Sequence, residues 1–110
     1  MKTVRSMILV SSDPLSMERG AQQVFESLEQ EIRAFGLQDE ISIKMVGDVG
    51  RHDAVPMVIV YPEAILYGPL QPSDAHRLVE EHLYKGRVAE ELLAPVRELT
   101  GKLEIGRAHV

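Results

Sequence analysis

The sequence contains no cysteine among its 110 residues. Disulfide bonds, thiolate-bound metals, iron–sulfur clusters held by thiolates and cysteine nucleophiles are therefore excluded. Tryptophan is also absent and only 5% of the residues are aromatic, so the core has to be largely aliphatic. No apolar run approaches the roughly 18 residues that are typical of a transmembrane helix. The longest run, Met57–Tyr61, has the length of a strand.

Positive charge is scarce. The chain has 12 Lys and Arg residues against 17 Asp and Glu, which gives a formal net charge of -5. An acidic domain lacks the basic surface that nucleic-acid backbones require, so nucleic acid is not an expected partner. The segment Met1–Val10 is too short for a signal peptide and has no small-residue cleavage site. We therefore expect a soluble, cytoplasmic protein that does not enter a membrane.

The first half of the chain predicts a strand, a helix and a second strand. Met7–Val10 is a continuous apolar run, which is typical of a strand buried on both faces. Apolar residues at spacings of three and four within Met17–Phe35 predict a helix that ends at Gly36. Ile41–Val46 alternates with a period of two and predicts a strand. This order favours a right-handed crossover between the two strands.

The second half predicts a hairpin followed by a second helix. Met57–Tyr61 and Ile65–Tyr67 are apolar strands joined by a short turn. Gln71–Asp74 favours a helix start, because it places proline at the first helical position and an acid in the first turn. That helix is expected to end at Gly86. The order β-α-β-β-β-α is that of an α/β, thioredoxin-like fold, with a four-stranded mixed sheet flanked by helices.

Residues 56–93 carry the motifs of a particular family. The matching segments are Pro56-Met57-Val58-Ile59-Val60-Tyr61-Pro62-Glu63, Tyr67-Gly68, Gln71-Pro72-Ser73-Asp74, Val79-Glu80-Glu81-His82-Leu83 and Gly86-Arg87-Val88-Ala89-Glu90-Glu91-Leu92. With these segments the chain resembles the thioredoxin-like [2Fe-2S] ferredoxins, a module that recurs in the small flavin-side subunits of NADH dehydrogenases and NAD-linked hydrogenases. We assign residues 1–95 to this domain and residues 96–110 to a C-terminal tail, which is expected to be partly disordered.

The resemblance implies four cluster ligands, and none of the matching positions holds a cysteine. Ser11 ends the first strand, Ser16 precedes the first helical turn, and Asp48 and His52 lie in the loop before Pro56. The family spacing is intact although every thiolate is absent. Because iron–sulfur clusters are held by soft thiolates, the chain is predicted to be a degenerate member without a cofactor.

Alternative hypotheses use the same positions. A hard or borderline metal would suit the imidazole and carboxylate of Asp48 and His52, together with Ser11 and Ser16. A catalytic set of Ser11 or Ser16 with His52 and Asp53 lacks a nucleophile elbow and an oxyanion motif, so we expect no enzyme activity. A third hypothesis is that the vacated loop serves as a pocket for a small ligand.

The remaining polar and aromatic residues have structural interpretations. His82 is expected to pack on the inner face of the second helix, where the helix dipole would stabilise it. His76 lies six residues earlier and does not share a ligand face with His82. Tyr61 and Tyr67 are interpreted as packing residues. The family usually has Asp-Gly in the hairpin turn, whereas this chain has Glu63-Ala64, so a different turn type is expected.

The preferred hypothesis is a non-catalytic interaction module. It would act as an accessory, assembly or regulatory partner of a redox complex. The resemblance also implies a homodimer, since stand-alone members of the family pair. The predicted contact surface surrounds the old cluster loop and comprises Asp13, Gly47, Asp48, Gly50, Arg51, His52 and Asp53. Its acidic members Asp13, Asp48 and Asp53 would attract a basic redox partner by electrostatic steering.

Overall fold

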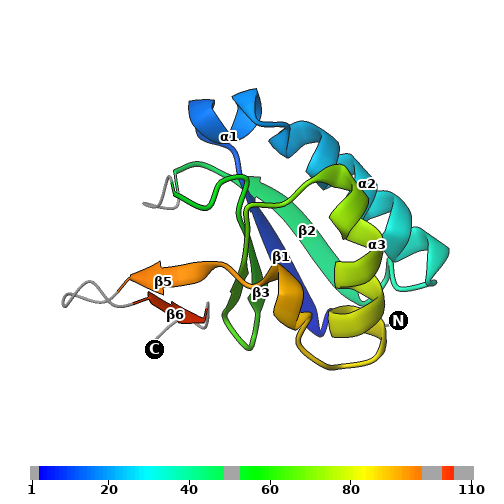
Figure 1. Ribbon diagram of the computed structural model, residues 1–110. Helices are drawn as coiled ribbons and strands as arrows, with labels where there is room; N and C mark the ends of the chain where they lie inside the picture. Colours follow the sequence, from blue (N-terminus) through cyan, green and yellow to red (C-terminus); the bar gives the residue numbers. More distant parts are fainter. Residues whose placement is uncertain (1–2, 49–52, 98–102, 106–110) are drawn as a thin grey trace.

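The computed structural model describes residues 3–48, 53–97 and 103–105 (Figure 1). Its body is a four-stranded sheet with the strand order β2-β1-β3-β4. The strands are β1 (Ser6–Ser11), β2 (Ile41–Val46), β3 (Val58–Tyr61) and β4 (Ile65–Tyr67). β1 pairs with β2 in parallel, and β3 lies antiparallel to both β1 and β4. The predicted fold class is confirmed, and each predicted strand is present in its predicted order.

The helices differ from the prediction in their internal structure. They are α1 (Pro14–Glu18), α2 (Ala21–Ala34), the 3-10 helix η1 (Pro72–Asp74), α3 (Ala75–Leu78), the π-helix η2 (Val79–Tyr84) and the 3-10 helix η3 (Glu90–Leu92). The predicted first helix is interrupted at Gly20, whose φ of 98° is a left-handed conformation that glycine adopts without steric cost. The second predicted helix is instead a continuous succession of 3-10, α and π turns.

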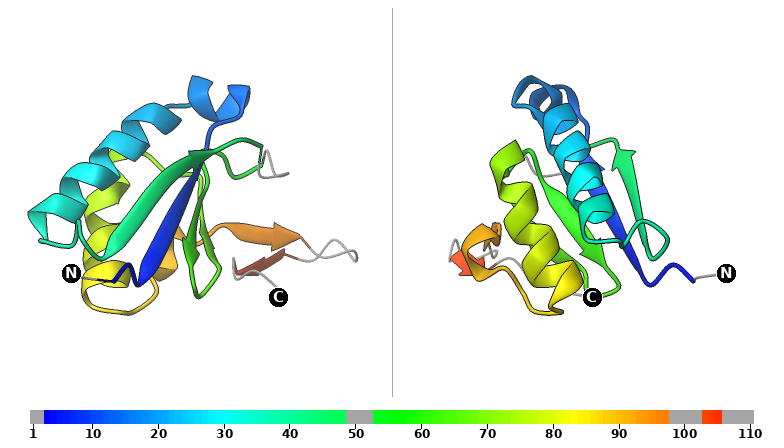
Figure 2. Two further views of the ribbon diagram at one scale, coloured as in Figure 1. Left: turned by 180° about the vertical axis from the view of Figure 1, so that it is seen from behind. Right: turned by 90° about the vertical axis from the view of Figure 1, so that its right-hand side faces the viewer.

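The core lies between the sheet and one layer of helices, α2 and the α3–η2 segment (Figure 2). β1 and β3 contribute alternate residues to it, and α2 contributes an apolar stripe. Its central members are Ile8, Val10, Val24, Leu28, Val58, Val60, Tyr67, Leu78 and Val79. The core is aliphatic as predicted, apart from the fully buried Tyr67. A second, smaller apolar cluster of Ala54, Val55, Met57 and Ala94 packs with Leu15 and Leu66.

The segment after η3 runs along the outer edge of β4. The Gly68 N–H donates to the Leu92 carbonyl at 3.0 Å, and the Ala94 N–H donates to the Leu66 carbonyl at 3.0 Å. Beyond this segment, β5 (Pro95–Arg97) pairs antiparallel with β6 (Leu103–Ile105) in a separate two-stranded sheet. The predicted domain boundary therefore falls at the start of β5. No helix within the described ranges is long and apolar enough to span a membrane.

The β3–β4 hairpin turns through a residue with a positive φ. Ala64 has a φ of 60°, which is uncommon for a residue with a side chain. The turn therefore uses the left-handed region that glycine favours at a position where this chain has alanine.

Candidate functional site

The structure brings together the first two of the predicted cluster-ligand positions. Ser11 ends β1 and Ser16 lies in α1, and their hydroxyl oxygens are 2.8 Å apart. Both residues are 0% exposed. The Met57 N–H donates to Ser11 Oγ at 2.8 Å, and Ser16 Oγ donates to Asp13 Oδ1 at 2.5 Å. The two hydroxyls therefore connect the chain just before β3 to the corner between β1 and α1.

The direction of these hydrogen bonds follows from the number of protons. Each hydroxyl has one proton, and that of Ser16 is donated to the Asp13 carboxylate. The contact between the two serines therefore needs the proton of Ser11. The bonds run in one direction from the Met57 N–H through Ser11 and Ser16 to Asp13. Hydrogen bonds aligned in this way polarise and strengthen one another. We call these four groups the serine chain.

Asp13 occupies its place because it caps α1. Its backbone is extended (φ -63°, ψ 164°), its Oδ2 accepts the Ser16 N–H at 3.3 Å, and Pro14 follows at the first helical position. Asp13 is 6% exposed. This corrects the expectation that it lies on an exposed acidic face. The pattern Asp-Pro-x-Ser was the local signal of this capping role, since an aspartate before a helical proline is a preferred N-cap.

The other predicted interaction residues lie around the loop after β2. Gly47 accepts a backbone hydrogen bond from the Ser12 N–H at 3.4 Å, which holds the start of the loop against the end of β1. Asp48 and Asp53 are exposed. Gly50, Arg51 and His52 lie outside the described residues, so the fourth predicted ligand position does as well. Of the predicted acidic face, the described part of the chain therefore exposes Asp48 and Asp53.

The donor set does not fit a [2Fe-2S] cluster. It contains no thiolate, and the hydroxyls of Ser11 and Ser16 are fully buried and already bonded within the serine chain. A metal ion would have to displace these satisfied bonds in exchange for neutral hydroxyl ligands, which are weak donors for iron. Among the described residues, no three His, Asp or Glu side chains are grouped to hold a metal. The same burial argues against either serine as a nucleophile, because a substrate cannot reach it.

A second buried polar group lies inside the core. The Tyr67 hydroxyl and His82 Nδ1 are 2.6 Å apart, and the Ala89 N–H donates to the same hydroxyl at 3.2 Å. The hydroxyl thus accepts the Ala89 N–H and shares a second hydrogen bond with His82 Nδ1. The other ring nitrogen, Nε2, lies 3.5 Å from Glu63 Oε1.

The environment of His82 confirms one part of its prediction and corrects another. The side chain is buried, as expected for a packed residue. Burial lowers the pKa of His82, and the partly opposing charge of Glu63 does not reverse this. Burial therefore favours the neutral form of the ring, whereas the predicted helix-dipole interaction would stabilise its cationic form.

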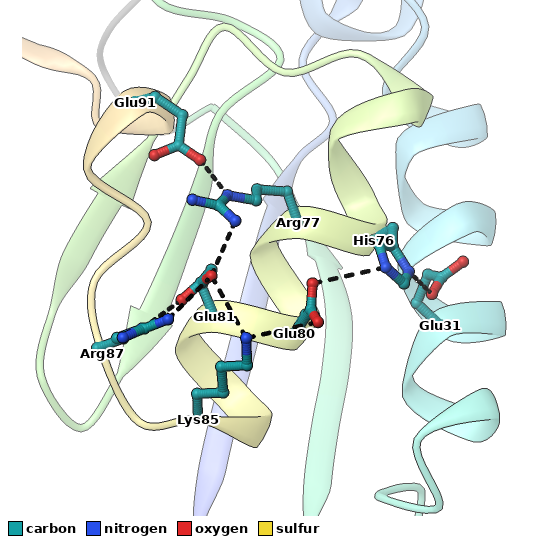
Figure 3. Close-up of polar contacts among 8 residues, drawn as sticks. All are labelled: Glu31, His76, Arg77, Glu80, Glu81, Lys85, Arg87 and Glu91. Atoms are coloured by element: carbon teal, nitrogen blue, oxygen red, sulfur yellow. Dashed lines mark hydrogen bonds and ion pairs between the residues drawn. The ribbon is translucent and has the colours of Figure 1, made fainter.

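Glu81 is a buried carboxylate that the sequence did not single out (Figure 3). It is 4% exposed, and its oxygens lie 2.8 Å from Arg77, 2.5 Å from Arg87 and 3.9 Å from Lys85. The hydrogen bond from Arg87, with the charges of Arg77 and Lys85, lowers the pKa of Glu81 despite its burial. The sequence signal for these ion pairs was the placement of Arg77 and Lys85 four residues before and after Glu81. The Arg87 pair connects η2 to the segment that follows it, and the Arg77 pair connects η2 to α3.

His76 links the two helical segments of the core layer (Figure 3). Its Nδ1 lies 2.8 Å from Glu31 on α2, and its Nε2 lies 3.6 Å from Glu80. The hydrogen bond and charge of Glu31, with the charge of Glu80, raise the pKa of His76. His76 and His82 thus contact different partners, as predicted from their spacing.

Comparison with known proteins gives a consistent set of relatives. No protein-family model matches the chain. The chain is 30% identical over 70 residues to a 2Fe-2S ferredoxin of Clostridium pasteurianum, covering 64% of this chain and 69% of that protein. It is 31% identical over 77 residues to a 2Fe-2S ferredoxin of Aquifex aeolicus (strain VF5), covering 69% of each. The crystal structure of the wild-type thioredoxin-like [2Fe-2S] ferredoxin from Aquifex aeolicus matches with a TM-score of 0.75 and 26% identity, over 81% of this chain and 95% of that chain.

Proposed function

The chain belongs to the thioredoxin-like [2Fe-2S] ferredoxin family, and we propose that it is a cluster-free member that acts as an accessory, assembly or regulatory partner of a redox complex. The observation that carries this proposal is the serine chain. Two of the positions that match cluster ligands form a closed, buried hydrogen-bond network, and the chain contains no thiolate.

A ferredoxin body without its electron carrier retains its fold and its surfaces. A role in binding other proteins is therefore favoured over electron transfer or catalysis. We propose that it works in the cytoplasm, pairs with a second copy of itself and contacts a redox complex through the loop that exposes Asp48 and Asp53. Exposed carboxylates at that loop favour a partner with a basic surface, because complementary charges accelerate encounter.

Treatment with iron and sulfide under reducing conditions tests the cluster-free part of the proposal. We expect the native chain to bind no stoichiometric iron and to remain colourless. The matched control is a variant in which Ser11, Ser16, Asp48 and His52 are all replaced by cysteine, since it restores four thiolates at the family spacing. Stoichiometric iron in the native chain would refute the proposal. The same metal analysis, extended to zinc and manganese, tests the alternative metal site at these four positions.

Cross-linking in the source cells tests the partner. The full chain carrying an affinity tag is cross-linked, purified under denaturing conditions and analysed by mass spectrometry. We expect cross-links from the tagged chain to subunits of a flavin- or iron–sulfur-containing complex. A variant with Asp48 and Asp53 replaced by asparagine should lose most of them, because it removes the exposed carboxylates without changing side-chain size. Cross-links confined to copies of the chain itself would contradict a redox partner.

A further inference from the structure

The two edges of the four-stranded sheet differ in what covers them. β4 forms one edge, and the segment after η3 covers it through the backbone hydrogen bonds at Leu66 and Gly68. β2 forms the other edge, and no segment in the described ranges pairs with its outer side (Figure 2). An uncovered edge strand presents a row of unpaired N–H and C=O groups, which is a template for a further strand. The backbone of β2 is therefore available to an extended segment of another protein.

The side chains of β2 divide between the two faces of the sheet. Ile41 is buried in the core, and Ile43 and Met45 pack against the core while they remain partly exposed. Because side chains alternate along a strand, Lys44 lies on the face away from the helices, where it is exposed. A strand added to β2 therefore needs apolar side chains toward the helices and polar or charged side chains on the other face.

A hollow of about 120 Å³ lies between β2 and α2. It is lined by Glu29, Ile32, Arg33, Gln38, Ile41 and Ile43. On an added strand, the side chain opposite Ile43 stands on the same face of the sheet as Ile43, and so it faces this hollow. An aliphatic side chain at that position would cover apolar surface of Ile43 that is otherwise in contact with water.

Lys44 determines which side chain suits the other face. It is the one charged residue in β1 to β4, although the protein has a net charge of -5. Among the described residues it forms no ion pair. Opposite charges at paired positions of neighbouring strands stabilise a sheet, whereas like charges destabilise it. An acidic residue beside Lys44 is therefore favoured over a basic one.

We propose that β2 binds an extended segment of a partner protein as a further strand, and that this segment has an acidic residue between two apolar residues. Backbone hydrogen bonds to β2 give affinity, while the hollow and Lys44 select the side chains. This inference goes beyond the proposed function, because it assigns a second contact. Its charge preference is opposite to that of the loop that exposes Asp48 and Asp53.

Fluorescence anisotropy with a labelled synthetic peptide tests the inference. The probe is Ser-Thr-Leu-Glu-Val-Thr-Ser, in which leucine and valine share one face of a strand and glutamate lies on the other. We expect saturable binding to the full native chain, and about tenfold weaker binding when lysine replaces the glutamate of the peptide. Lys44→Glu should reverse this preference. The control is Arg19→Glu, which makes the same charge change at an exposed residue outside β2 and should leave the preference unchanged.

N-methylated peptides test the backbone contact separately. Successive N–H groups of a strand point to opposite edges, so an added strand uses alternate N–H groups to bond to β2. One probe is methylated at the leucine and valine nitrogens, and a second is methylated at the glutamate and the following threonine. We expect one of these two patterns to abolish binding and the other to leave it nearly unchanged.

Three results would overturn the inference. They are the absence of saturable binding below about 1 mM, equal affinity of the native chain for the glutamate and lysine peptides, and equal effects of the two methylation patterns. Circular dichroism establishes that Lys44→Glu folds, and the peptide variants decide the question on the native chain if it does not. Cross-linking to redox subunits is read separately, so a chain that forms those cross-links without binding the peptide would refute this inference and retain the proposed function.

Discussion

The serine chain should contribute measurably to folding, and removal of either hydroxyl tests this. Ser11→Ala leaves the Met57 N–H without its acceptor, and Met57 is buried. An unpaired buried donor costs about 1–3 kcal/mol. Ser16→Ala removes a hydrogen bond to the Asp13 carboxylate, a class of bond that contributes about 1.5–3 kcal/mol. We expect each variant to lose free energy of unfolding within these ranges.

The double variant should lose less than the sum of the two single losses. Both substitutions break the same hydroxyl–hydroxyl bond, so its contribution is counted twice when the single effects are added. Residues in one hydrogen-bond network typically show coupling energies of about 0.5–3 kcal/mol. In a domain of about this size, 1 kcal/mol corresponds to a shift in Tm of roughly 4–8 °C. Each single loss should therefore be visible in a thermal scan.

Urea unfolding of the native chain, both single variants and the double variant provides the free energies. The control is Ser73→Ala, which removes a hydroxyl from an exposed position in η1 and should change stability by less than about 0.5 kcal/mol. The slope of free energy against urea should stay constant across the set. If Ser11→Ala costs no more than Ser73→Ala, or if the single losses add without coupling, the hydrogen-bond assignment is refuted.

Three further predictions concern other buried groups. Burial lowers the pKa of His82, so on acidification the histidine of the unfolded chain is protonated before that of the folded chain. The free energy of unfolding should therefore fall as pH drops below about 6.5, and urea unfolding of His82→Gln should lack this part of the pH dependence. The neighbouring cations lower the pKa of Glu81, so its charged form stabilises the folded chain. Glu81→Gln should therefore lower the Tm at neutral pH, and the difference in Tm from the native chain should vanish at strongly acidic pH in pH-dependent thermal scans. Gly68→Ala would place Cβ 2.2 Å from the Ala54 carbonyl oxygen, so denaturant unfolding should show a loss of about 3 kcal/mol, whereas Gly47→Ala meets no atom within 4 Å and should be tolerated.

The strands were predictable because their signal is local. Met7–Val10 is apolar along its whole length and Ile41–Val46 alternates, and both patterns are typical of strands. The continuous run predicted burial on both faces of β1, which is wrong, because Met7 is 36% exposed on the face opposite the helices. The helix interruption at Gly20 was harder to predict from the sequence, since the apolar spacing of the two helices continues across it. The π turns of η2 have hydrogen bonds between residues five apart, such as the Lys85 N–H bond to the Glu80 carbonyl at 2.9 Å, and the apolar spacing does not distinguish them from α turns.

The proximity of Ser11 and Ser16 was predictable from the sequence, whereas their hydrogen bonding was not. The family spacing located Ser11 and Ser16, but it described them as vacated ligands beside an exposed acidic loop. The buried, hydrogen-bonded state of their hydroxyls depends on contact with the Met57 N–H, which is 46 residues from Ser11 along the chain. The burial of Asp13 depends on the same corner, because a capping carboxylate is drawn toward the helix that it caps. Residue type alone would assign all three groups to solvent.

The buried state of these residues changes how the loss of cysteine is understood. If the sulfurs had merely been removed, the remaining hydroxyls would be orphaned polar groups in a buried corner, at a cost of about 1–3 kcal/mol each. Instead, every buried side-chain nitrogen and oxygen in the described ranges has a partner. Such a network is tolerated only while all of its members are present, since replacing one leaves its neighbours unpaired. Ser11, Ser16 and Asp13 therefore depend on one another for their hydrogen bonds, so a substitution at one of them affects all three.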